Sequence, residues 1–351
     1  MKAIKYFVIA VILLVTGCNK PSPVPEQEQY DRYIFFSSEV ETKGTLIDSP
    51  ASMQNFGIVG YKYDNALSWA NTTAADRSPV FYDLKQAVPI YRDTINVSTS
   101  GNCTYAPIQG WSNSKKYSFF AYYPLSDTIV TLSNTDNGGT PTITYTMDVT
   151  SVTDFKESMV DVMTASQKDV YGYESIGSQP INGDVNLSFD HRLSCLAVYV
   201  KKVSSCDIEL NSITLNISGI KYNQVNIPLD GGTIQGSSTT PIASQEFALA
   251  LTDDEKSGAV TTGTGTELSD KLIFIPQTEP ISIQAVVNYT RKASGYIADV
   301  TNSITLPVLT TSLTEKTKHL IQLNFSDSTV SVNGIANSTW IKIEDVYDTF
   351  N

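Results

Sequence analysis

Alternation of apolar and polar residues with a period of two is the dominant pattern in this chain of 351 residues. Such alternation is typical of β-strands that bury one face and expose the other to water. Strand patterns of this kind lie at residues 117–123, 142–147, 185–191, 213–217, 247–251, 281–289 and 321–325. Turn residues separate them, and we expect at most one short helix, between residues 154 and 162. The sequence therefore predicts an all-β fold of antiparallel sandwiches.

The length of the chain suits two such sandwiches better than one. The most turn-rich stretch between strand patterns is residues 171–183, directly before the alternating segment that starts at Val185. We therefore expect an N-terminal β-sandwich over residues 30–182 and a C-terminal β-sandwich over residues 183–351.

The first 29 residues predict export and anchoring. Two lysines precede an apolar run that is too short to span a membrane and is typical of a signal peptide. The run ends in VTGC, which resembles the lipobox of bacterial lipoproteins and implies that residues 1–17 are removed and Cys18 is acylated, for example with palmitate. The alternative is an ordinary signal peptide with an incidental cysteine. Residues 18–29 contain three prolines and predict a lipidated tether.

The net charge argues against one class of partner, and the cysteine count limits the possible disulfides. Without the signal peptide, 22 basic residues stand against 36 acidic ones, and this acidic balance argues against nucleic acid as a partner. Besides Cys18 the chain has Cys103, Cys195 and Cys206, an odd number that cannot all pair within the chain. A bridge between Cys195 and Cys206 is compatible with export, although their spacing does not fit a directly opposed pair.

Sequence motifs for catalysis and metal binding are missing. His191 is in phase with the apolar positions of its strand, which predicts a buried structural residue, whereas His319 is expected at an exposed strand start. The acidic run at residues 253–255 is expected to be a solvated turn rather than a glycosidase pair. No phosphate loop, nucleophile elbow or zinc motif is present. We therefore expect no enzyme, no cofactor and no metal.

Several sequence blocks follow the tether in a defined order: FGIVGY at 56–61, YAP at 105–107 with Trp111, YSFFAYYP at 117–124, MVDVM at 159–163 and VNLSFDHRL at 185–193. Their order and spacing over about the first 200 residues resemble the fimbrillin-like lipoproteins of Bacteroidetes. The resemblance implies a type V pilus subunit with two tandem transthyretin-like β-sandwich domains. Such subunits are exported as lipoproteins, trimmed by a trypsin-like protease and polymerised by strand exchange.

The resemblance also implies a plug strand. In the family, an N-terminal strand fills the first domain until a protease cuts after a basic residue, and a strand of a neighbouring subunit then replaces it. Here the cut is expected between Lys43 and Gly44, in a polar stretch open to a protease. Family members more often carry arginine at this point, and Arg32 is the competing site. The plug strand corresponds to residues 33–40, with groove-filling side chains at Ile34, Phe35, Phe36 and Val40.

The C-terminal residues leave two alternatives open. Short apolar stretches from about residue 329 on follow the last clear strand, and their candidate donor side chains are Val330, Val332, Ile341 and Ile343. They form either a donor arm that enters a neighbouring subunit or a closing hairpin that turns at Asn333-Gly334. Tip subunits lack a donor arm, so this choice also separates a stalk subunit from a tip subunit.

From these expectations we predict that the protein is a structural subunit, or a tip or accessory adhesin, of a cell-surface fimbria. We expect its lipid to anchor it to the outer membrane. The expected partners are other fimbrial subunits or copies of this chain, together with an adhesion ligand on a host or bacterial surface. Two triplets resemble the O-glycosylation sequon of these bacteria and mark Thr94 and Thr128. The alternative, from another class, is a surface lipoprotein that binds glycan for nutrient uptake.

Overall fold

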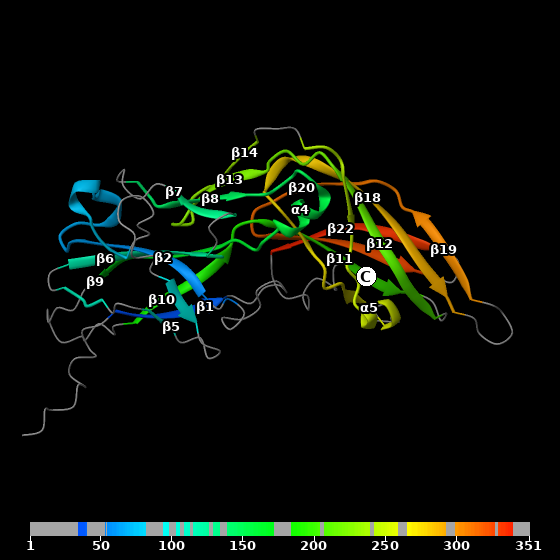
Figure 1. The fold of residues 1–351 in the computed structure, drawn as a ribbon, viewed down its shortest axis with the longest axis horizontal. Helices are drawn as coiled ribbons and strands as arrows, with labels where there is room; N and C mark the ends of the chain where they lie inside the picture. Colours follow the sequence, from blue (N-terminus) through cyan, green and yellow to red (C-terminus); the bar gives the residue numbers. More distant parts are fainter. Residues whose placement is uncertain are drawn as a thin grey trace, which may run out of the picture.

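The computed structural model describes residues 34–40, 53, 55–81, 94–97, 103–105, 109–112, 115–125, 129–133, 139–171, 184–203, 207–238, 242–258, 265–292, 299–326 and 329–339. These residues form β-strands with a few short helices, so the predicted all-β fold is confirmed. The molecule is elongated, with the N-terminal strands at one end and the last strands at the other (Figure 1).

The described residues form four sheets. The N-terminal sheet has the order β1 (Phe35–Val40), β10 (Asp184–His191), β9 (Met163–Tyr171), β6 (Lys115–Tyr123), β2 (Asn55–Asp64), β4 (Thr94–Val97) and β5 (Cys103–Thr104), with β3 (Ser78–Phe81) on β2. A bridging sheet has the order β14 (Gln235–Ser237), β13 (Gln224–Pro228), β8 (Thr142–Thr146) and β7 (Val130–Ser133).

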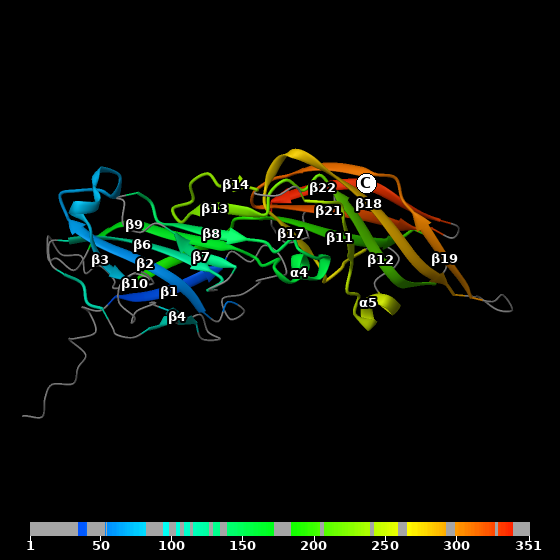
Figure 2. The same ribbon diagram turned by 45° about the horizontal axis from the view of Figure 1, so that its top comes forward.

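The other two sheets face each other in the C-terminal half. One has the order β16 (Thr266–Glu267), β11 (Ser194–Lys202), β21 (Thr317–Phe325) and β22 (Val330–Thr339), with β17 (Leu272–Phe274) on β11. The other has the order β15 (Gln245–Ala248), β12 (Ile208–Ser218), β18 (Gln277–Arg291) and β19 (Val300–Thr305), with β20 (Leu309–Leu313) on β18. Figure 2 shows strands β11, β12, β18, β19, β21 and β22 together in this half of the molecule.

Helices are short. The helix expected between residues 154 and 162 is α4 (Val152–Glu157), and the Ser151 side chain accepts a hydrogen bond from the Asp154 amide at its start. The acidic run expected to be a solvated turn begins α5 (Asp253–Gly258). That prediction was wrong for Glu255, whose carboxylate turns inward and accepts hydrogen bonds from the backbone amides of Thr252 and Ser269.

Strands β2 and β6 are buried on both faces. Ile58 and Phe119 lie in one apolar cluster, whereas Val59 and Phe120 lie in another on the opposite side of the sheet. Burial on both faces explains why their segments are continuous apolar runs rather than clean alternations. The N-terminal sheet therefore has a core of its own on one side and shares a second core with the bridging sheet on the other.

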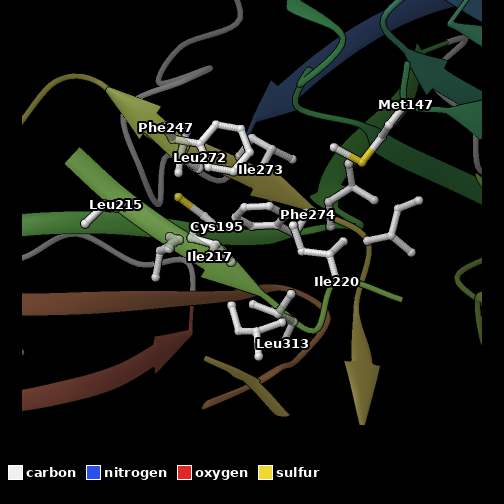
Figure 3. Packing of buried hydrophobic residues seen from close by; sticks show 14 of the residues in the cluster. Met147, Cys195, Leu215, Ile217, Ile220, Phe247, Leu272, Ile273, Phe274 and Leu313 are labelled. Carbon is white, nitrogen blue, oxygen red and sulfur yellow. The ribbon is translucent and has the colours of Figure 1, made fainter. Parts of the chain in front are cut away.

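The second core runs without a break from the N-terminal half into the C-terminal half. Met147, which follows β8, packs in the same cluster as Phe247, Phe274 and Leu313 of the C-terminal half (Figure 3). The two halves therefore share apolar packing, in addition to the bridging sheet that pairs β8 with β13.

Arg192 marks the point where the chain changes sheets. Strand β10 belongs to the N-terminal sheet and β11 to a sheet of the C-terminal half, so the chain passes from one sheet to the other at residues 192–193. The fully buried Arg192 guanidinium donates to Glu315 (Nε, 2.7 Å) and, from Nη1, to Thr164 Oγ1 at 2.9 Å. It also donates to the carbonyl oxygens of Pro228 (2.9 Å) and Gly232 (2.6 Å). One charged group thus joins both halves and the bridging sheet.

Candidate functional site

Strand β1 lies at the edge of the N-terminal sheet. It pairs in parallel with β10, from Phe35 opposite Asp184 to Val40 opposite Phe189 (Figure 2). On its other side, the Ile34 amide donates to the Gln109 carbonyl at 2.9 Å, and the Tyr105 hydroxyl donates to the Ile34 carbonyl at 2.6 Å. The segment is therefore held between β10 and the chain that follows β5.

Two side chains of this segment enter the N-terminal core. Ile34 is fully buried and Phe36 is 4% exposed. The Phe36 ring makes edge contacts with Phe81, Tyr105 and Phe119, with centroids 5.3, 5.6 and 5.4 Å away. Phe35 and Val40 belong to the strand, but their side chains lie outside the described residues.

The residues that receive Phe36 come from three distant parts of the chain. Phe81 ends β3, Phe119 lies in β6, and Tyr105 follows β5. Period-two alternation gives no sign of which strands meet across a core, so the sequence does not identify Phe81 as a contact of the plug strand. A groove for one strand is thus built from residues that only the tertiary structure brings together.

At the other end of the chain, β22 is the edge strand of its sheet. It pairs antiparallel with β21 from Phe325 opposite Val330 to Thr317 opposite Thr339. Val330 is 3% exposed, and Val332 is half-buried against the shared core. Both residues therefore belong to the chain's own sheet.

Strand β21 ends at Phe325 and β22 begins at Val330, and the Ser326 amide donates to the Thr329 carbonyl between them. The expected turn at Asn333-Gly334 is wrong. Gln322 pairs with Gly334 and Leu323 with Val332, so Asn333 is the extra residue of a β-bulge. Gly334 has φ +123°, a conformation that glycine adopts without strain. An Asn-Gly pair fits such a bulge as well as it fits a hairpin turn.

The burial of the two histidines was predicted correctly for one and wrongly for the other. His191 is buried as predicted, and its Nδ1 lies 2.9 Å from Asp161 Oδ1. His319 is fully buried, so its predicted surface position is wrong. Strand β21 begins at Thr317, four residues before the alternating pattern at residues 321–325, and His319 pairs with the core residue Leu196 of β11.

The remaining predicted sites fall into two groups. Thr94 begins β4, where it pairs with Gly57, and Cys195 is a buried free thiol whose pKa is raised to about 12 by burial. The others lie outside the described residues: Cys18, Lys43, Gly44, Thr128, Cys206, Ile341 and Ile343.

Among the described residues, no group of His, Cys, Asp and Glu side chains could hold a metal ion. None of the helices formed by these residues is long and apolar enough to cross a membrane.

A model of a family described as fimbrillin-like matches residues 65–340. The chain belongs to the fimbrillin-like family. A similar solved structure is a fimbrial protein from Bacteroides vulgatus, with 21% identity, a TM-score of 0.61, and coverage of 88% of this chain and 99% of that one. The fimbrial anchor protein Mfa2 from Porphyromonas gingivalis is 13% identical, with a TM-score of 0.33 and coverage of 88% and 98%. A search of curated proteins found no match. The first of these structures supports the fimbrillin-like fold alone.

Proposed function

We propose that this fimbrillin-like protein is a structural subunit, or a tip or accessory adhesin, of a cell-surface fimbria assembled by protease-triggered strand exchange. The observation that carries the proposal is the segment of residues 34–40, which contains the edge strand β1 and whose two described side chains, Ile34 and Phe36, fill a core built by other strands. Its parallel pairing with β10 joins residues about 150 positions apart in the sequence, so β1 is an added strand rather than part of a local hairpin.

Release of β1 would open a groove with a defined chemistry. The backbone of residues 184–189 in β10 would lose its partner strand, and the rings of Phe81, Tyr105 and Phe119 would lose their contact with Phe36. Each apolar side chain that leaves such a site forfeits about 1.5–3 kcal/mol of burial. A sheet edge with an apolar groove associates readily with another strand.

The proposed trigger is cleavage between Lys43 and Gly44, three residues after the end of β1 at Val40. A cut there would separate β1 from the rest of the chain, so only noncovalent contacts would retain it. A cut at Arg32 would leave β1 attached to the folded domain. Lys43 is therefore the site that fits the proposal.

The two predicted sets of donor residues differ in what donation would require of the subunit. Donation by Val330 and Val332 requires β22 to leave β21, because these residues pair within the chain's own sheet. Donation by Ile341 and Ile343 requires no such rupture, since both follow β22 in the sequence. We therefore place Ile341 and Ile343 first, and a subunit that keeps both sets to itself would act at the tip.

The proposed location is the cell surface, with acylated Cys18 holding the precursor in the outer membrane and residues 18–29 acting as its tether. Two or three acyl chains anchor a protein firmly, whereas one holds it only marginally. The proposed partners are other fimbrial subunits or copies of this chain, and the role requires no catalysis.

The test compares Lys43→Ala with its matched control Arg32→Ala in the full-length precursor. After treatment with a trypsin-like protease, the wild-type protein and Arg32→Ala should give a product that starts at Gly44 and forms an SDS-sensitive ladder. Lys43→Ala should give neither. Assembly of Lys43→Ala at the wild-type level would refute the trigger. A wild-type protein that never forms a ladder but is retarded on polysaccharide affinity gels would instead support the glycan-binding class.

A further inference from the structure

His319 lies at a seam between the two sheets of the C-terminal half. Its sheet ends in the edge strand β22, and the facing sheet brings β20 to the same side. The imidazole contacts both edges: Nδ1 lies 2.8 Å from Asn337 Oδ1 in β22 and 3.3 Å from Thr311 Oγ1 in β20. One buried side chain therefore bridges the two sheet edges.

The hydrogen bonds of His319 determine its tautomer. The backbone amide of Thr314 donates to Nε2 at 3.3 Å, and an amide nitrogen can only donate, so Nε2 carries no proton. The proton of the neutral ring is then on Nδ1, where it is donated to the Asn337 oxygen. This arrangement uses both ring nitrogens and requires the neutral form.

Protonation would break this arrangement. A proton on Nε2 would point at the Thr314 N–H, so that two donors face each other, and a positive charge would be created at a fully buried position. Burial lowers the pKa of His319 below its ordinary 6.5, and the hydrogen bond to Asn337 opposes this effect only in part.

Charged neighbours do not compensate for that proton. In the described part of the chain, the side chains that hydrogen-bond to the ring are those of Thr311 and Asn337, and its partner in β11 is the apolar Leu196. The charged side chains of the preceding turn and the same strand are each engaged in ion pairs: Glu315 with Arg192, Lys316 with Asp190, and Lys318 with Glu267.

We propose that His319 is a pH-sensitive latch that holds β22 across this seam at neutral pH and releases it in acid. Strand β22 is the element that yields, because it is paired on one side only, with β21. The latch stands independently of the proposed function. Its use in assembly rests on that function, since release of β22 would free Val330 and Val332 as donor residues.

The direction of the pH dependence follows from the pKa of His319 in the latched and released states of β22. In the latched state the pKa of His319 lies below 6.5, and in the released state the ring titrates near 6.5. The released state therefore binds more protons, so the latch is fully effective above pH 6.5 and weakens as the pH falls. Lowering the pH from 7.5 to 5.0 can favour release by up to about 30-fold if the latched ring stays neutral.

Hydrogen exchange of the full chain tests this inference. After correction for the chemical effect of pH, amides of residues 330–339 should exchange between about threefold and 30-fold faster at pH 5.0 than at pH 7.5. Strand β19, the edge strand of the facing sheet, and the central strand β12 serve as internal controls and should keep their protection. Equal protection of β22 at both pH values, or equal acid loss in β12, would overturn the latch.

The matched variant is His319→Gln, which stays neutral throughout this range. Its β22 amides should show no response to acid, whatever their protection at pH 7.5; an acid response of wild-type size would refute the role of His319. NMR of the wild-type protein with labelled histidine gives a second measurement that needs no variant. The chain has two histidines, and the titration of His319 should share its midpoint with the exchange of β22. Different midpoints would overturn the proposal.

Discussion

Replacing Phe36 by alanine should weaken the hold of the N-terminal sheet on β1 more than it weakens the rest of the fold. Phe36 is 4% exposed and contacts three aromatic rings. Truncation of a buried phenylalanine to alanine costs about 3–5 kcal/mol, which includes the loss of its ring contacts. Strand β1 has six residues and lies at the edge of its sheet, so most of this cost should appear as local detachment.

The free energy can be converted into a measurable opening. A loss of about 3–5 kcal/mol multiplies the population with β1 detached by a factor on the order of 100 to 5,000. Hydrogen exchange of residues 184–190 in β10 should rise by that factor, and trypsin should release β1 correspondingly faster from the cleaved chain. Ser37→Ala, which removes only a hydroxyl from the next position, is the matched control.

Two results would contradict this reasoning. If β10 exchange rises by less than tenfold, Phe36 does not determine how tightly β1 is held. If β10 and the central strand β12 lose protection together, β1 is a cooperative part of the whole fold and not a separable strand. In the second case the groove could not exist in a folded subunit.

Three further predictions concern other parts of the chain. Arg192→Leu should lower the free energy of unfolding by about 3–5 kcal/mol in urea denaturation, because it leaves buried hydrogen-bond acceptors without their donor. A loss below about 1 kcal/mol would show that the contact between the two halves does not depend on the guanidinium. Val330→Asp should destabilise the monomer by more than about 3 kcal/mol, because it buries a carboxylate beside an apolar core. Ser331→Asp, at the exposed neighbouring position, should change the stability by no more than about 0.5 kcal/mol. Equal effects of the two substitutions would argue against the β21–β22 pairing. Cys18→Ala should remove the protein from the membrane fraction or leave its precursor uncut, and normal processing and anchoring of this variant would refute lipidation.

Strand positions and fold class could be predicted from the sequence alone. The period-two segments at residues 213–217 and 321–325 lie within β12 and β21, and their apolar positions are buried in the shared core. Alternation predicts these elements because it reports which faces of a strand meet water, and that requirement is local. The turn residues between strands act locally as well.

Strand partners were decided only by the tertiary structure. The pairings of β1 with β10 and of β11 with β21 are parallel, although the alternation suggested antiparallel sheets throughout. Strand β10 lies in one sheet with β9 and β1, whereas the next strand in the sequence, β11, lies in another sheet. A pattern of period two marks the two faces of a strand but does not identify its neighbour, so it cannot distinguish a strand that ends one sheet from one that begins the next.

In the candidate site, too, the sequence predicts the segments and the tertiary structure decides what they contact. The sequence by itself, through its resemblance to the family, placed Ile34 and Phe36 in one extended segment, and its apolar pattern placed Val330 and Val332 in a short stretch after the last clear strand. Only the tertiary structure decided that the first segment closes a core with Phe81 and Phe119, and that the second lies beside β21. It also decided that His319 is buried at the seam of two sheets. Each of these facts depends on contacts between residues distant in the chain, and such contacts are selected by the packing of the whole molecule rather than by local sequence.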